Sequence, residues 1–116
     1  MINIGTLAAL SFVGVGFLFI FLSIPLIAGR VKPNGIYGYR TRKTLSSEPI
    51  WYEANRFLGR ELIKAGRVIV LGSACLAVAN LIMRENLATI FVLGMALTGF
   101  CVFAAIFRSM AYVTRL

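Results

Sequence analysis

The sequence predicts an all-α membrane protein with three transmembrane helices and one amphipathic helix at the membrane surface. Of its 116 residues, 59% are hydrophobic and 14% are charged, and the mean hydropathy is +0.88. A soluble domain of this length needs more polar surface to enclose one core. Residues 4–29 and 87–107 carry no charge, and each is long enough to cross a hydrocarbon core of about 30 Å.

The first predicted span covers residues 4–29. Residues 1–3 lack the positive charge that begins a signal peptide, and the apolar run is longer than a signal peptide needs, so we expect it to stay in the mature protein. Pro25 is expected to kink or end the helix. Gly14 and Gly16 offer small surfaces for close helix packing.

The second and third predicted spans cover residues 62–83 and 87–107. The second is purely apolar only from residue 68 to 82, so Lys64 and Arg67 must extend toward the membrane surface. Residues 84–86 alone separate the two spans, which predicts a tight antiparallel hairpin. Asn80 is expected to bond between helices or to a partner subunit, or else to be solvated near the membrane boundary.

The distribution of cations predicts the orientation. Twelve Lys and Arg against four acidic residues give a net charge of +8, and nine of the twelve lie between Arg30 and Arg67. The tail adds Arg108 and Arg115. By the positive-inside rule, the first connection and the C-terminus face the cytoplasm and the N-terminus faces outward. Cations beside apolar spans favour anionic phospholipid headgroups as partners, and not nucleic acid.

The connection from residue 30 to 61 divides into a turn-rich half and a helical half. Pro33-Asn34-Gly35 is a strong turn signal, and Gly38 gives the backbone freedom. Ser46 or Ser47 can cap a following helix. That helix carries charged residues at spacings of three and four, so it is expected to lie in the inner interface before turning into the second span. The charged residues are Glu53, Arg56, Arg60, Lys64 and Arg67.

Individual residues in this connection allow two interpretations each. Arg40, Arg42 and Lys43 either bind a phosphate-bearing or acidic partner or only set the topology. Arg40 stands out because neighbouring tyrosines can stack on its guanidinium and order a pocket. Asn55 and Arg56 either form a recognition pair or are structural, with Asn55 tying down loop carbonyls and Arg56 pairing with Glu53. Trp51 favours a role as an interface anchor.

The sequence gives little support for catalytic activity or metal binding. The chain has no His, its only acids are four Glu, and no nucleotide or metal-ligand spacing appears. Cys75 and Cys101 both lie in apolar runs and are interpreted as buried hydrophobes. We therefore expect no enzyme activity, no cofactor and no metal.

Three clusters in the connection resemble the signature of the SdpI family of bacterial membrane proteins. They are Asn34-x-x-Tyr37-Gly38-Tyr39-Arg40-Thr41, then Thr44-Leu45, then Trp51-x-x-Ala54-Asn55-Arg56 with Gly59. The resemblance covers essentially the whole chain, residues 1–116, as a single domain. It corresponds to a short form, because the immunity protein that names the family carries additional spans ahead of this part.

The resemblance implies a location and a function. The location is the bacterial cytoplasmic (inner) membrane, with several passes. The function is resistance to, or sensing of, a membrane-active peptide toxin by a non-catalytic protein. The residues implied to shape the binding loop are those of the signature: Asn34, Tyr37, Gly38, Tyr39, Arg40, Thr41, Thr44, Trp51, Asn55, Arg56 and Gly59. The alternative function is a small accessory subunit of a larger membrane complex.

Overall fold

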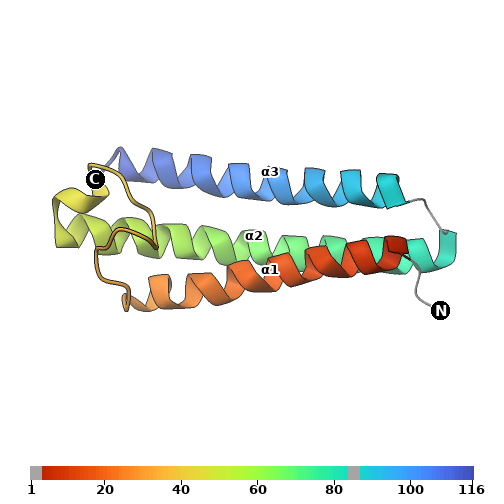
Figure 1. Ribbon diagram of the computed structural model, residues 1–116. Helices are drawn as coiled ribbons and strands as arrows, with labels where there is room; N and C mark the ends of the chain where they lie inside the picture. Colours follow the sequence, from red (N-terminus) through yellow and green to blue (C-terminus); the bar gives the residue numbers. More distant parts are fainter. Residues whose placement is uncertain (1–3, 84–86) are drawn as a thin grey trace.

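A computed structural model describes residues 4–83 and 87–116. In this range the chain forms three long helices, α1 (Ile4–Ala28), α2 (Glu48–Met83) and α3 (Leu87–Val113), with a short 3₁₀ turn, η1 (Thr44–Ser46), ahead of α2. The three helices lie side by side as an elongated antiparallel bundle of 52 × 23 × 20 Å, with α2 in the middle (Figure 1). Each is long and apolar enough to cross a membrane. The predicted all-α, three-span fold class is confirmed.

Helix α2 is longer than either predicted element. Its 36 residues span about 54 Å at 1.5 Å per residue, while a hydrocarbon core is about 30 Å thick. The predicted surface helix and the second span are therefore one continuous helix, and the predicted turn between them does not occur. Gly59 and Gly66 do not break the helix because both face α1. A Cβ on Gly59 would lie 3.1 Å from the carbonyl oxygen of Ser23.

The contact between α1 and α2 depends on a pair of glycines. A Cβ added to Gly16 would lie 2.8 Å from the carbonyl oxygen of Gly66, and a Cβ on Gly66 would lie 2.7 Å from that of Gly16. The two backbones can approach this closely only because neither residue has a side chain. Gly14, by contrast, has open space around it. The predicted small surface on α1 therefore consists of Gly16 and not of Gly14.

At the other end of the bundle, α1 and α2 are joined by a buried polar contact. The side-chain amide of Asn80 donates to Thr6 Oγ1 at 2.9 Å, and both residues are buried. This confirms the interhelical interpretation of Asn80. The predicted hairpin connection at residues 84–86 lies outside the residues that the structure describes.

Helix α1 ends in a Schellman motif. Gly29 has a φ of 70°, the Arg30 N–H donates to the Pro25 carbonyl at 3.0 Å, and the Gly29 N–H donates to the Leu26 carbonyl at 3.3 Å. Pro25 lies inside the helix, which ends one turn later than that residue. This reversal directs the following loop back toward α2.

Candidate functional site: a folded cap at one end of the bundle

The loop from residue 29 to 47, called the cap below, folds over one end of the bundle. It runs from the end of α1 to the start of α2, and the C-terminus lies at the same end (Figure 1). The N-terminus lies at the opposite end. Nine of the eleven predicted site residues belong to the cap or to the first two turns of α2, so the structure brings them together.

The first turn of the cap is built on Asn34. Its Oδ1 accepts from the N–H groups of Ile36 and Tyr37 at 2.8 and 2.7 Å, and its Nδ2 donates to the carbonyls of Lys32 and Tyr37 at 2.7 and 3.0 Å. The amide thus replaces backbone partners that a loop lacks, which is the usual role of Asn in turns. The predicted turn at this position is confirmed.

The centre of the cap is formed by Trp51 and Asn55 of α2. Trp51 is fully buried, and its indole N–H donates to the Val31 carbonyl at 2.8 Å. Asn55 is 2% exposed; its Oδ1 accepts the Tyr39 N–H at 2.6 Å, and its Nδ2 donates to the Trp51 carbonyl at 2.9 Å. Trp51 therefore lies inside the protein rather than against headgroups. Asn55 binds a loop N–H, and not the loop carbonyl that the structural interpretation expected.

Gly38 lies directly over these two side chains. Its φ is 117°, and an added Cβ would lie 2.7 Å from Asn55 Oδ1 and 3.1 Å from the Trp51 ring. Both the backbone conformation and the close contact require glycine here. The position of Gly38 in the signature follows from this geometry.

Two threonines close the end of the cap before α2. The Thr41 N–H donates to Thr44 Oγ1 at 2.8 Å, and the Thr44 N–H donates to Thr41 Oγ1 at 3.1 Å. The buried Thr44 hydroxyl also donates to the Tyr39 carbonyl at 2.8 Å. Helix α2 then begins with Ser47 as its cap, because Ser47 Oγ accepts the Ile50 N–H at 3.3 Å. Of the two predicted capping serines, Ser47 is the one used.

The side chains of Tyr37 and Arg40 fasten the cap from outside. The Tyr37 hydroxyl donates to the Leu22 carbonyl of α1, and burial raises the pKa of this phenol above its ordinary value. Arg40 is exposed, and its Nε donates to the Asn34 carbonyl at 2.9 Å. Arg40 is thus held by a backbone carbonyl, and its guanidinium remains open to solvent on the cap surface.

Arg56 and Gly59 connect α2 to the end of α1. The guanidinium of Arg56 lies against Gly29, where an added Cβ would be 2.9 Å from Nη2. In the described part of the chain Arg56 and Glu53 form no ion pair, so that expectation is wrong. Instead Glu53 Oε2 accepts the Tyr112 hydroxyl at 2.8 Å, because the end of α3 lies beside this face of α2.

Contacts from α3 were not foreseen from the sequence. The Tyr112 ring stacks on Phe57 with centroids 4.2 Å apart, and Arg108 contacts Glu61 at 3.5 Å. Lys43 of the cap donates to the Thr114 carbonyl at 3.3 Å. A signal was available, since Glu61 and Arg108 lie at nearly equal distances along the chain from the predicted hairpin connection. An antiparallel hairpin places such residues side by side.

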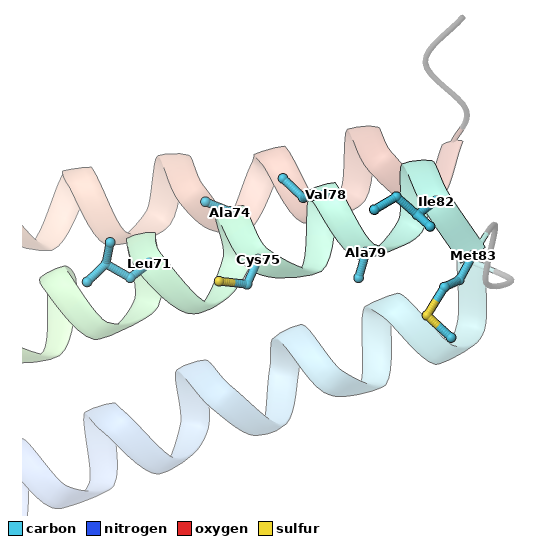
Figure 2. Close-up of a pocket in the computed structure, with 7 residues that line it drawn as sticks. All are labelled: Leu71, Ala74, Cys75, Val78, Ala79, Ile82 and Met83. Carbon is cyan, nitrogen blue, oxygen red and sulfur yellow. The ribbon is translucent and has the colours of Figure 1, made fainter.

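One apolar hollow lies away from the cap. It has a volume of ≈540 Å³ and lies along α2 between Leu71 and Met83 (Figure 2). Its seven labelled side chains include Cys75, which is an exposed free thiol, while Cys101 is buried and also free. In residues 4–83 and 87–116, no three His, Cys, Asp or Glu side chains lie close enough to hold a metal ion. None of the signature residues lines this hollow.

Comparisons with known proteins identify the family of the chain. The model of the SdpI/YfhL protein family matches residues 30–106, which is more than half of the chain and includes every signature residue. The chain is also similar to a protein of Bacillus subtilis (strain 168) named "Uncharacterized protein YfhL", with 40% identity over 52 residues. That match covers 45% of this chain and 46% of the relative, less than half of its length. No solved structure matches the chain significantly. The chain is a multi-pass membrane protein and belongs to the SdpI/YfhL protein family.

Proposed function

We propose that this protein is a non-catalytic membrane protein that resists or senses a membrane-active peptide, with the cap as the surface that the peptide meets. The cap would lie at the cytoplasmic face of a bacterial inner membrane, since most of the chain's cations lie in the cap and in the adjoining part of α2. The class of ligand, a membrane-active peptide, is inferred from the family resemblance. The surface that would contact it is inferred from the fold of the cap.

One observation carries this proposal: the polar groups of the signature hold the cap in one conformation and are not left free for chemistry. Asn34, Thr44 and Asn55 each bond to loop backbone, and Trp51 is buried beneath them. A loop that is already ordered loses little further conformational freedom when it binds a partner. This arrangement is typical of a binding surface and not of an active site.

The outer surface of the cap combines cations with an apolar side chain. Ile36 is 94% exposed at the tip of the Asn34 turn, and Arg40 and Arg42 are exposed nearby along the loop. An apolar group beside guanidinium groups is suited to a peptide that is itself partly inserted in the membrane surface. The same residues would also contact anionic headgroups when no peptide is present.

The test is survival of a sensitive bacterium that expresses this protein and is exposed to the secreted killing peptide for which the family's immunity protein is named. We expect wild type to raise survival and Arg40→Ala to reduce it to the level of cells without the protein. Arg60→Ala is the control, because it removes the same charge from the exposed face of α2, outside the cap, and leaves the bond from Arg40 to Asn34 in place. Immunoblots of membrane fractions check that all variants accumulate equally.

Two outcomes would contradict the proposal. Wild type could accumulate in the membrane and give no protection, or the Arg60→Ala variant could lose protection as fully as Arg40→Ala, which would assign the effect to net charge alone. In the first case, purification in mild detergent would test the alternative function, because an accessory subunit copurifies with a larger complex at fixed stoichiometry.

A further inference from the structure

A groove of ≈340 Å³ runs between α2 and α3 on the part of the bundle nearest the cap. We call it the α2–α3 groove. Its walls are formed mainly by apolar side chains, among them Val68 of α2 and Leu97, Phe100 and Ala104 of α3. Its volume is large enough for part of an acyl chain.

The mouth of the α2–α3 groove is charged. Glu61, Lys64 and Arg108 line the groove and also line a second, more polar hollow of ≈300 Å³, which extends to Arg115. The apolar and polar hollows therefore meet at these three side chains. Such a continuous surface has one end suited to hydrocarbon and the other suited to an anion.

The geometry of the mouth leaves its cations available. Glu61 Oε1 lies 3.6 Å from Lys64 Nζ, and Glu61 Oε2 lies 3.5 Å from Arg108 Nη1. The Glu61 side chain is only 9% exposed, whereas those of Lys64 and Arg108 are 63% and 64% exposed. Glu61 thus holds two cations beside each other while most of their N–H donors remain free. With Arg115, three cations face one carboxylate, so the mouth is positive.

The level of the mouth along the bundle matches the boundary of a membrane. Arg108 directly follows the uncharged residues 87–107, which are long enough to cross the hydrocarbon core, and Lys64 lies just ahead of the apolar residues 68–83. The cations then lie at the depth of lipid phosphates. The apolar part of the α2–α3 groove lies at the depth of acyl chains.

From these observations we propose that the α2–α3 groove binds one anionic phospholipid, with its phosphate at Lys64 and Arg108 and an acyl chain along Val68, Leu97 and Phe100. Charge-assisted hydrogen bonds from both cations select the phosphate and the negative headgroup. The site is separate from the Asn34 turn and the Trp51–Asn55 contact, so it does not depend on the peptide role of the cap.

The experiment is native mass spectrometry of the purified protein with phosphatidylglycerol, phosphatidylethanolamine or phosphatidylcholine added in detergent. We expect one phosphatidylglycerol to be retained in preference to the other two lipids. Lys64→Gln and Arg108→Gln should each weaken that retention about fivefold, the factor expected for one cation at a membrane surface. Ala104→Phe, which fills the groove and leaves all charges in place, should reduce it as well.

Two variants serve as matched controls. Arg60→Gln removes an exposed cation of α2 that lines neither hollow, and Ala96→Phe adds a ring to an exposed position of α3 that does not line the groove. Both should retain phosphatidylglycerol as wild type does. Circular dichroism establishes that the variants keep their helix content.

The proposal is overturned if the wild-type protein retains phosphatidylcholine to the same extent as phosphatidylglycerol. It is also overturned if Ala104→Phe and Arg108→Gln retain as much phosphatidylglycerol as the two controls do. Either result would show that lipid binds nonspecifically around the whole bundle and not at a specific site. Soluble glycerol phosphate should not displace the bound lipid; displacement at equal concentration would show a phosphate site without a role for the apolar groove.

Discussion

Asn55 Oδ1 accepts the backbone N–H of Tyr39 at 2.6 Å, which joins the loop to a helix residue 16 positions later in the chain. The bond is shielded from solvent, since Asn55 is 2% exposed. The Trp51 indole joins α2 to the start of the cap at Val31, and the Asn55 bond fixes the middle of the cap to α2. The stability of the cap should therefore be most sensitive to Asn55 and to the residues in contact with it.

Replacing Asn55 by Leu should lower the free energy of unfolding by about 1–3 kcal/mol, because the Tyr39 N–H then lacks its partner in a shielded position. Thermal unfolding in detergent, followed by circular dichroism, measures the change. Arg60→Ala on the exposed face of the same helix is the control and should stay within about 0.5 kcal/mol of wild type. Equal stability of the two variants would contradict the importance of the bond.

Gly38→Ala should destabilise the cap by about 1–2 kcal/mol from the backbone conformation alone, since φ is 117° there. The new Cβ would also lie 2.7 Å from Asn55 Oδ1, which adds to the cost. Limited proteolysis of the loop gives a direct measurement, with faster cleavage expected. Gly35→Ala, where no atom lies within 4 Å of the new Cβ, should be cleaved no faster than wild type.

Gly66→Ala should weaken the packing of α1 on α2 by about 1–3 kcal/mol, as overpacking does in tight contacts. The new Cβ would lie 2.7 Å from the Gly16 carbonyl oxygen, and backbone cannot move aside as a flexible side chain can. The measurement is the unfolding temperature in detergent. Gly99→Ala, in open space on α3, should leave it unchanged or raise it. A lower unfolding temperature for Gly99→Ala than for Gly66→Ala would contradict the close contact between Gly66 and Gly16.

The cap should loosen in strong alkali. Burial raises the pKa of Tyr37, so its neutral form stabilises the fold fully below the unfolded pKa of about 10, and this contribution is lost as pH rises through the higher folded pKa. Ultraviolet absorbance of the phenolate follows the ionisation, and proteolysis of the loop follows the loosening. Tyr37→Phe should lack this step, whereas Tyr39→Phe should keep it. A step that persists in Tyr37→Phe assigns the ionisation to another group.

Much of the fold could be predicted because its determinants are local. Charge-free runs and their lengths predicted the spans, and the serine before Glu48 predicted the start of α2. The continuity of α2 could not be predicted in this way. The charged residues favoured a surface helix that turns into the second span. Only the close contact with Ser23 of α1 explains why Gly59 is favourable within a continuous helix.

The site was predicted as a set of residues, but not as a set of contacts. The signature located Asn34, Gly38 and Asn55 together, yet the partner of each depends on how the loop returns over α2. The Arg56–Glu53 pair failed because a helix-spacing rule takes no account of Tyr112, which arrives from α3. Such contacts depend on the register of the hairpin, and a single sequence specifies that register only indirectly.

Hydrogen exchange of the Tyr39 amide in lipid nanodiscs tests most directly that the signature builds an ordered cap. The bond to Asn55 predicts exchange as slow as that of amides within α2, and Asn55→Leu should make this amide exchange as fast as an exposed loop. Fast exchange of the Tyr39 amide in the wild-type protein would contradict an ordered cap and, with it, the binding surface proposed here.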